Sequence, residues 1–265
     1  MADYDFLFPN LCCIPSSKIQ KIFALLKYLY FIIAAIEIIA EAIPSPNLRF
    51  FTKSLLMPLL IATYSQSLSG QWNRFHRLIV AALVFSWFGD LALLWVPGNE
   101  TDRLLMRTHK DANYFLVGLA SFLIAHLLYC LAFIRVNDAT APMLLKSKPV
   151  YFAPLLIYML VLLGLLLPAM LASPLNKPFI APVIIYAIAI GMMVLFALNR
   201  YRRVNDMSFV LVATGACLFT LSDSIIAVNK FLYPFALSGV LIMLLYAAGQ
   251  YFIAWGCLAQ FNKEG

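Results

Sequence analysis

The chain has 265 residues, of which 63% are hydrophobic and only 12% are charged. Soluble domains carry about 25% charged residues, so this composition excludes a water-soluble globular domain and indicates a chain that needs lipid as its solvent. The net charge of +7 fits loop lysines and arginines that face anionic lipid, and it does not indicate a nucleic-acid partner.

Long apolar runs follow one another along the chain. In hydrocarbon only helices and closed barrels satisfy every backbone polar group, and continuous runs favour helices, because barrel strands alternate apolar and polar residues. A helix needs about 20 mostly apolar residues to cross a bilayer, and the segments that qualify are 19–41, 50–68, 76–96, 112–135, 150–171, 178–199, 207–229 and 233–259. We predict an all-α polytopic membrane protein whose single domain, residues 19–261, is a bundle of eight transmembrane helices.

The loops carry an uneven distribution of positive charge. With eight spans both termini share one side of the membrane, and the loops on that side hold most of the lysines and arginines, including the basic run 200–203. By the positive-inside rule, we expect the terminal segments 1–18 and 262–265 to be cytoplasmic. Such a protein would lie in the inner membrane of a bacterium, or in the endoplasmic reticulum or plasma membrane of a eukaryote.

The third and seventh segments are similar to each other. The third holds Phe85-Ser-Trp-Phe-Gly-Asp90 and the seventh holds Phe219-Thr-Leu-Ser-Asp223, so each places a small residue directly before a carboxylate. An offset of four spans gives the two copies the same orientation, as in the parallel repeats of some transporters. The similarity is consistent with a 4+4 parallel repeat.

A few polar side chains lie within the predicted spans. A charge in such a position costs several kcal/mol and is by default a hypothesis for a functional site. The strongest candidates are Asp90 and Asp223, because each lies in a strongly apolar helix and is too short to reach the interface. The remaining candidates, which would surround the two carboxylates, are Lys53, Glu37, Ser86, Asn113, His126, Ser222, Tyr246 and Gln250.

In the predicted orientation the charged candidates share one half of the membrane. Glu37, Asp90 and Asp223 lie past the midpoints of spans that run outward, and Lys53 lies near the start of a span that runs inward. This pattern predicts one polar cavity in the non-cytoplasmic half of the bilayer. Structural roles are the open alternatives, with Glu37 pairing with Lys53 and with His126 forming a hydrogen bond between helices.

The sequence contains none of the common motifs for metal or serine chemistry. It has no HExxH pair and no cysteine cluster with metal-ligand spacing, and it has no GxSxG elbow of the lipase type. We therefore expect no metal and no other cofactor. Two carboxylates and a lysine suit metal-free acid–base chemistry.

Taken together, the motifs resemble the YhhN family of membrane proteins, whose vertebrate members are lysoplasmalogenases. The matching pieces occur in the family's order and are Lys53-Ser-Leu-Leu-Met-Pro58, Phe85-Ser-Trp-Phe-Gly-Asp90, Phe115-Leu-Val-Gly-Leu-Ala-Ser-Phe-Leu-Ile-Ala-His126-Leu-Leu-Tyr129, Gly215-Ala-Cys-Leu-Phe-Thr-Leu-Ser-Asp223-Ser and Tyr246-Ala-Ala-Gly-Gln250. The resemblance implies hydrolysis of the vinyl ether bond of lysoplasmalogens, with a lysophospholipid from the surrounding bilayer as substrate. The products would be a fatty aldehyde and glycerophosphoethanolamine or glycerophosphocholine.

In that reaction an alkene is protonated, an oxocarbenium ion forms and water adds to it. Glycosidases catalyse a similar sequence with two carboxylates. We expect one of Asp90 and Asp223 to be the acid and the other to stabilise the cation and orient the water. Lys53 would keep that partner charged or contact the phosphate, while His126, Tyr246 and Gln250 would line the cavity. The alternatives are a small-molecule or lipid transporter that uses the carboxylates as a proton relay, and a lipid-binding structural protein without turnover.

Overall fold

The computed structural model describes the backbone over residues 16–43, 45–68, 70–96 and 109–261, and the side chains over these ranges except 16–24 and 109–111. The predicted terminal segments 1–18 and 262–265 lie almost entirely outside the described residues. Every regular element in the described ranges is helical, which confirms the all-α prediction.

Each predicted segment coincides with one long helix. In chain order these are α1 (Ser16–Ala42), α2 (Pro46–Ser67), α3 (Arg74–Leu94), α5 (His109–Phe133), α7 (Ala153–Ala172), α8 (Ile180–Leu198), α9 (Asp206–Ala227) and α10 (Ser238–Ala259), with the short α6 (Leu144–Ser147) before α7. A π-helical turn, η4 (Val228–Leu232), extends α9. The last helix begins later than predicted, because Pro234 and the left-handed backbone of Leu237 precede it.

Six of these helices are long and apolar enough to cross a membrane, namely α3, α5, α7, α8, α9 with η4, and α10. The other two, α1 and α2, do not meet both conditions over their described residues. Lys27, Glu37 and Glu41 lie on α1, while Arg49 and Lys53 lie on α2. These two helices therefore hold half of the charged candidates of the predicted site.

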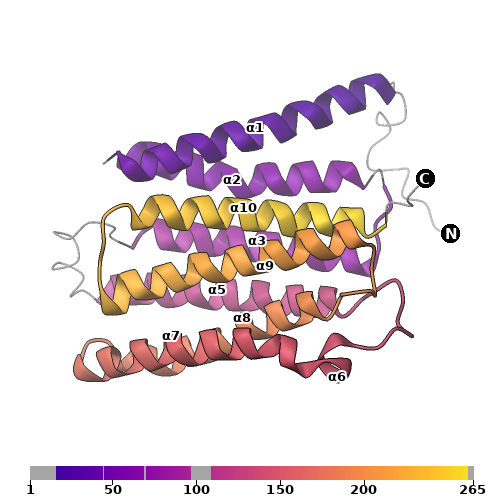
Figure 1. Cartoon of the computed structure of the whole chain (residues 1–265). Coiled ribbons are helices and arrows are strands. Elements are labelled where there is room, and N and C mark those ends of the chain that lie inside the picture. Colours follow the sequence, from indigo (N-terminus) through magenta and orange to yellow (C-terminus); the bar gives the residue numbers. More distant parts are fainter. Residues whose placement is uncertain (1–15, 44, 69, 97–108, 262–265) are drawn as a thin grey trace, which may run out of the picture.

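The helices run side by side in one bundle (Figure 1). Two helices, α1 and α2, lie at one side of it and α7 lies at the opposite side, next to α8, with the remaining helices between them. The most extensive contacts join α9 with α10 and α3 with α5. The start of α1 and the end of α10 lie at the same end of the bundle. The end at which α1 finishes, α2 begins and α3 finishes is called the α1–α2 turn end below.

Two glycines allow α9 and α10 to approach each other closely. A Cβ atom added to Gly215 would lie 2.7 Å from the carbonyl oxygen of Gly249, and one added to Gly249 would lie 3.0 Å from the carbonyl oxygen of Gly215. Small residues commonly permit such backbone contacts between membrane helices. The contact fixes α9 against α10 and thereby positions the polar side chains that both helices carry.

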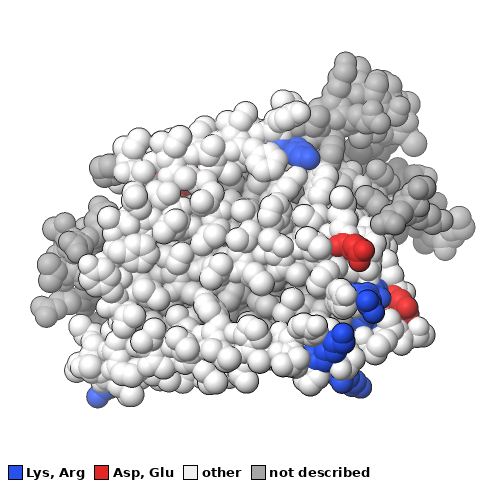
Figure 2. Space-filling model, in the orientation of Figure 1, with Lys and Arg blue, Asp and Glu red and all other residues white. Residues whose placement is uncertain are grey.

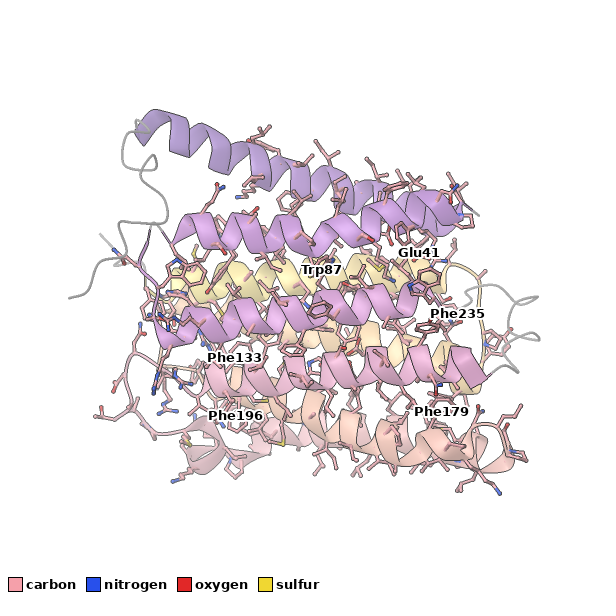
Figure 3. The ribbon with its side chains drawn as sticks, turned by 180° about the vertical axis from the view of Figure 1, so that it is seen from behind. Glu41, Trp87, Phe133, Phe179, Phe196 and Phe235 are labelled. Carbon is pink, nitrogen blue, oxygen red and sulfur yellow. The ribbon has the colours of Figure 1, made fainter. Side chains whose placement is uncertain are left out.

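A proline and a tryptophan fix the register of α2 against α3. Pro58 lies inside α2 and has no N–H, so it cannot donate to the carbonyl of Ser54 four residues earlier. That carbonyl instead accepts a hydrogen bond of 2.9 Å from Nε1 of Trp87 on α3. Figure 3 shows Trp87 in the middle of the bundle, beside α2. The bond brings the part of α2 that holds Lys53 next to the part of α3 that holds Asp90.

The exterior of the bundle is mainly apolar. On α7 the exposed side chains include Leu156, Ile157, Leu160 and Leu165, and Figure 2 shows a broad uncharged band with most charged side chains gathered at the end occupied by α6. An apolar belt of this kind is stable only against lipid, because monomeric soluble proteins rarely expose apolar patches of more than a few hundred Å².

Candidate active site

Asp90 is held by a side chain from a distant part of the sequence. It is buried in α3, and its Oδ2 accepts a hydrogen bond of 2.7 Å from the hydroxyl of Tyr246 on α10. One helical turn away, Gln250 on α10 donates to the hydroxyl of Ser86 on α3 over 3.0 Å. Residues four apart share a helix face, so these two hydrogen bonds form successive rungs between antiparallel helices.

A third helix contributes to this cluster. The hydroxyl of Tyr129 on α5 donates to Oε1 of Gln250 over 2.6 Å. The side-chain amide of Gln250 therefore accepts a hydrogen bond at Oε1 and donates one from Nε2. Because buried polar groups are costly when unpaired, this arrangement fixes the orientation of Gln250 and with it the spacing of α3, α5 and α10.

The charged groups of α1 and α2 adjoin Asp90. Lys53 and Glu37 are both electrostatic neighbours of Asp90, and the ammonium of Lys53 makes no hydrogen bond or ion pair with any described residue. Glu37 is fully buried, and its Oε2 accepts a hydrogen bond from Thr52. The other carboxylate oxygen of Glu37 has no hydrogen-bond partner in the described part of the chain. The cluster thus contains a cation and two carboxyl groups with unused hydrogen-bonding capacity.

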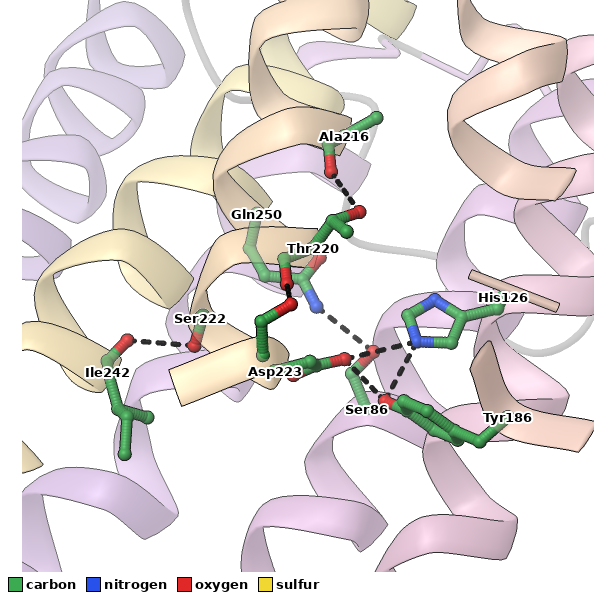
Figure 4. A network of polar contacts seen from close by, with 10 residues as sticks. Ser86, His126, Tyr186, Ala216, Thr220, Ser222, Asp223, Ile242 and Gln250 are labelled. Atoms are coloured by element: carbon green, nitrogen blue, oxygen red, sulfur yellow. Dashed lines mark hydrogen bonds and ion pairs between the residues drawn. The ribbon is translucent and has the colours of Figure 1, made fainter. Parts of the chain in front are cut away.

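Asp223 belongs to a second cluster, on the side of α9 that faces α5 and α8 (Figure 4). Its Oδ2 accepts a hydrogen bond from the hydroxyl of Tyr186 on α8 and lies 3.4 Å from Nε2 of His126 on α5. The same Nε2 atom lies 2.9 Å from the hydroxyl oxygen of Tyr186. Because Tyr186 donates its hydroxyl proton to the carboxylate of Asp223, the Tyr186 oxygen must act as the acceptor toward His126. Nε2 of His126 therefore carries a proton.

The opposite nitrogen of the His126 ring is unused. Nδ1 is buried and has no hydrogen-bond partner among the described residues. His126 is itself fully buried, so its tautomer is set by Tyr186 and Asp223 rather than by solvent. The three residues form a linked acid, base and hydroxyl group in the interior of the bundle.

Aromatic rings separate the two clusters. The ring centroid of Phe219 lies 4.9 Å from that of His126 and 5.3 Å from that of Tyr246. Phe122 completes this layer, 5.9 Å from Tyr246 and 6.1 Å from Phe219. Asp90 and Asp223 nevertheless interact electrostatically. The site therefore has one carboxyl group on each side of an apolar aromatic layer.

Two of the expected lining residues lie elsewhere. Asn113 is exposed near the beginning of α5 and forms no hydrogen bond with any described residue. The hydroxyl of Ser222 donates to the backbone carbonyl of Ile242 over 3.0 Å, which joins α9 to α10. The structure brings the remaining candidates into the two clusters. Within the described residues no three His, Cys, Asp or Glu side chains are grouped as metal ligands.

Three residues of the clusters were absent from the sequence-based candidates, namely Tyr186, Tyr129 and Thr52. Tyr186 had a usable signal, because it is the one hydroxyl-bearing side chain in α8. Tyr129 and Thr52 had no comparable signal, since tyrosine and threonine are ordinary constituents of membrane helices and their partners lie on other helices.

The family assignment rests on a match along most of the chain. The model of the YhhN family matches residues 48–257. The chain belongs to the YhhN family. This YhhN protein is therefore an integral multi-pass membrane protein, as its apolar helices indicate. The matched region includes every helix of the two clusters except α1, which supplies Glu37.

Curated relatives match a shorter region. The YhhN chain is 32% identical over 179 residues to lysoplasmalogenase TMEM86A of Bos taurus and equally similar to lysoplasmalogenase TMEM86A of Homo sapiens. Each match covers 66% of this chain and 63% of the relative, so it extends over less than two thirds of the relatives' own length. No solved structure matches the YhhN chain.

Proposed function

We propose that this protein is a lysoplasmalogenase-like ether hydrolase, which cleaves the vinyl ether bond of lysoplasmalogens. The products are a fatty aldehyde and glycerophosphoethanolamine or glycerophosphocholine. The observation that carries the proposal is the pair of aspartates in the bundle interior, each bonded to a tyrosine hydroxyl. The similarity to proteins named lysoplasmalogenase supports the choice of reaction.

The reaction consumes one water and needs a proton at two different atoms. In the first step a protonated aspartic acid gives its proton to the alkene carbon farther from the ether oxygen, which leaves an oxocarbenium ion. The second, ionised aspartate stabilises that cation and takes a proton from the water that attacks it. The resulting hemiacetal then collapses: the second aspartic acid returns its proton to the leaving glycerol oxygen, the hemiacetal hydroxyl gives its proton to the first aspartate, and the aldehyde is released with both aspartates in their starting states. Glycosidases use two carboxyl groups in a similar division of roles.

The surrounding residues have supporting roles in this scheme. Tyr246 orients Asp90, while Tyr186 and His126 orient Asp223. Lys53 supplies a positive charge beside Asp90 and so balances the negative charge of the site. Phe219 and Phe122 exclude water from the alkenyl chain and offer their ring faces to the oxocarbenium ion, because aromatic faces attract cations.

The same proposal includes a topology. We propose that α1 and α2 cross the bilayer with the other six helices, so that residues 19–261 form one domain of eight spans with both ends of the chain in the cytoplasm. The site would then lie in the non-cytoplasmic half. The α3–α5 and α9–α10 contacts are the most extensive of the bundle and occupy equivalent places in a 4+4 parallel repeat, which supports that arrangement.

The decisive experiment uses purified protein in detergent with a choline or ethanolamine lysoplasmalogen. We expect stoichiometric release of aldehyde by the wild type. We expect Asp90→Asn and Asp223→Asn each to abolish turnover while the protein still elutes as a single folded species. Asn113→Ala is the matched control, because Asn113 lies outside both clusters, and it should retain full activity.

Two results would overturn the proposal. Full activity in either aspartate variant would remove the two-carboxylate mechanism. Movement of a lipid or small molecule that depends on a sealed vesicle, with no aldehyde released, would indicate a transporter that uses the carboxylates as a proton relay.

A further inference from the structure

A pocket opens at the α1–α2 turn end, outside the two clusters. Its volume is about 220 Å³, and it is lined by Pro46, Asn47, Arg49, Phe50, Leu94 and Trp95. The first four residues belong to the first turns of α2, and the last two lie where α3 ends. The pocket therefore lies between the ends of the two helices that carry Lys53 and Asp90.

The spacing along both helices relates this pocket to the candidate active site. Arg49 precedes Lys53 by four residues, and Leu94 follows Asp90 by four residues. Residues four apart lie on one helix face, about 6 Å apart along the axis at 1.5 Å per residue. The pocket thus lies one helical turn farther toward the end of the bundle than Lys53 and Asp90, on the same faces of α2 and α3.

Arg49 gives the pocket a positive charge with free donors. Its Nε donates to Oε1 of Glu41 over 3.1 Å, and its two Nη groups have no hydrogen-bond partner in the described part of the chain. A guanidinium group with two free amino groups matches the oxygens of a phosphate group and can bind them in a bidentate manner. Glu41 holds the arginine in place through the one nitrogen that such a contact does not need.

Trp95 adds a site for a cation. Its side chain is 62% exposed and stacks with Tyr114, with ring centroids 6.2 Å apart, so one face of the indole remains available. Indole faces attract ammonium groups, and quaternary ammonium ligands are commonly bound in this way. A pocket that combines Arg49 with Trp95 thus offers complementary partners for a phosphate and an adjacent ammonium group.

We propose that this pocket binds the zwitterionic headgroup of the lysophospholipid substrate, with Arg49 on the phosphate and Trp95 on the ethanolamine or choline ammonium. The inference rests on the proposed ether hydrolase function and extends it. In a lysoplasmalogen only the glycerol backbone separates the phosphate from the vinyl ether. A headgroup in the pocket therefore places the vinyl ether about one helical turn deeper, level with Lys53 and Asp90. In this arrangement Lys53 balances the charge of Asp90 and does not contact the phosphate.

The test compares substrates with and without a headgroup. For Arg49→Gln we expect the KM for choline and ethanolamine lysoplasmalogens to rise roughly 10- to 100-fold with little change in kcat, as for a lost charge-assisted contact. Activity toward 1-alkenylglycerol, which has no phosphate, should be unchanged. For Trp95→Leu we expect a rise in KM of about 3- to 30-fold for the choline substrate.

Controls separate headgroup binding from a structural role of the ion pair. Arg77→Gln and Trp72→Leu change the same residue types at the opposite end of the bundle and should leave all constants unchanged. Glu41→Gln removes the negative charge but keeps a side-chain oxygen that can accept the hydrogen bond from Nε of Arg49, so the arginine stays in place and the variant should retain the wild-type preference for phosphorylated substrates. If Glu41→Gln reproduces Arg49→Gln, or if Arg49→Gln affects 1-alkenylglycerol equally, the headgroup assignment is wrong.

A binding measurement distinguishes failure of this inference from failure of the proposed function. A saturated 1-O-alkyl lysophosphocholine has no vinyl ether and cannot be hydrolysed by the proposed chemistry. We expect native mass spectrometry to show that it binds the wild type and binds Arg49→Gln roughly 10- to 100-fold more weakly. Equal binding by both proteins would refute the headgroup site even if turnover is observed. Weaker binding without any turnover would retain the headgroup site and refute the hydrolase.

Discussion

The hydroxyl of Tyr246 lies 2.7 Å from Oδ2 of Asp90, although 156 residues separate the two in the sequence. The bond joins α3 to α10 within the cluster that also includes Lys53. Tyr186 has the equivalent relationship with Asp223. Each carboxyl group of the site therefore has its own tyrosine, and the contribution of each tyrosine can be measured separately.

Removing the Tyr246 hydroxyl should impair the chemical step. We expect Tyr246→Phe to lower kcat for vinyl ether cleavage roughly 10- to 100-fold, the loss associated with one hydrogen bond to a charged group. Tyr30→Phe is the matched control, because the Tyr30 hydroxyl donates to the backbone carbonyl of Ala247 and not to a carboxylate. Equal kcat values for the two variants would show that Tyr246 does not act through Asp90.

The second tyrosine can be tested in the same way. Tyr186→Phe should lower kcat to a similar extent and should shift the pH–rate profile, because it removes the hydroxyl shared by Asp223 and His126. Tyr158→Phe provides the control, since the Tyr158 hydroxyl donates to Ser224, the residue after Asp223, over 2.6 Å. An unshifted profile in Tyr186→Phe, or the same shift in both variants, would contradict a specific link to Asp223.

The hydrogen bond between Trp87 and the Ser54 carbonyl should contribute to the stability of the fold. Trp87→Phe leaves the Ser54 carbonyl without its donor, and we expect a loss of about 1–3 kcal/mol in the free energy of unfolding. Pro58→Ala restores an N–H within α2 that can satisfy the same carbonyl. The cost of Trp87→Phe should therefore be smaller in a Pro58→Ala background. A double-mutant cycle measured by unfolding in detergent checks this coupling, and strict additivity would argue against it.

The close contact between α9 and α10 should not tolerate a methyl group. Gly249→Ala forces a Cβ atom to 3.0 Å from the carbonyl oxygen of Gly215, and we expect a loss of about 1–3 kcal/mol as in other overpacked interiors. Gly164→Ala is the control, because a Cβ at Gly164 has no heavy atom within 4 Å. That change should leave stability unchanged or raise it slightly through helix propensity. Thermal unfolding of both variants in detergent measures the difference.

The helices could be predicted from the sequence because each depends on a local property, a long apolar run. The two aspartates could be singled out for a similar reason, since a short carboxylate side chain in such a run is expensive wherever its neighbours lie. The register between helices could not be predicted. It depends on side-chain contacts such as Trp87 with Ser54, and a shift of one residue would rotate Tyr246 away from Asp90.

The lining residues show the same limit. His126 and Gln250 were identifiable by polarity alone, but their partners Tyr186 and Tyr129 were not, because a tyrosine becomes informative only when its hydroxyl has a known neighbour. Asn113 has the polarity of a lining residue and lies at the exposed start of α5. The sequence showed which side chains were costly to bury, and the packing of the helices determined which of them meet.

The long separation between Asp90 and Tyr246 also has a consequence for biosynthesis. A nascent chain enters the bilayer from its N-terminus, so α3 is inserted long before the ribosome has made α10. Until then Asp90 lacks Tyr246, and Ser86 lacks Gln250. An unpaired carboxyl group in hydrocarbon is costly, so α3 should remain beside the insertion machinery or near water until the last helix arrives. Arrest of translation before α10 should therefore leave a chain that is readily extracted from the membrane and cleared by quality-control proteases.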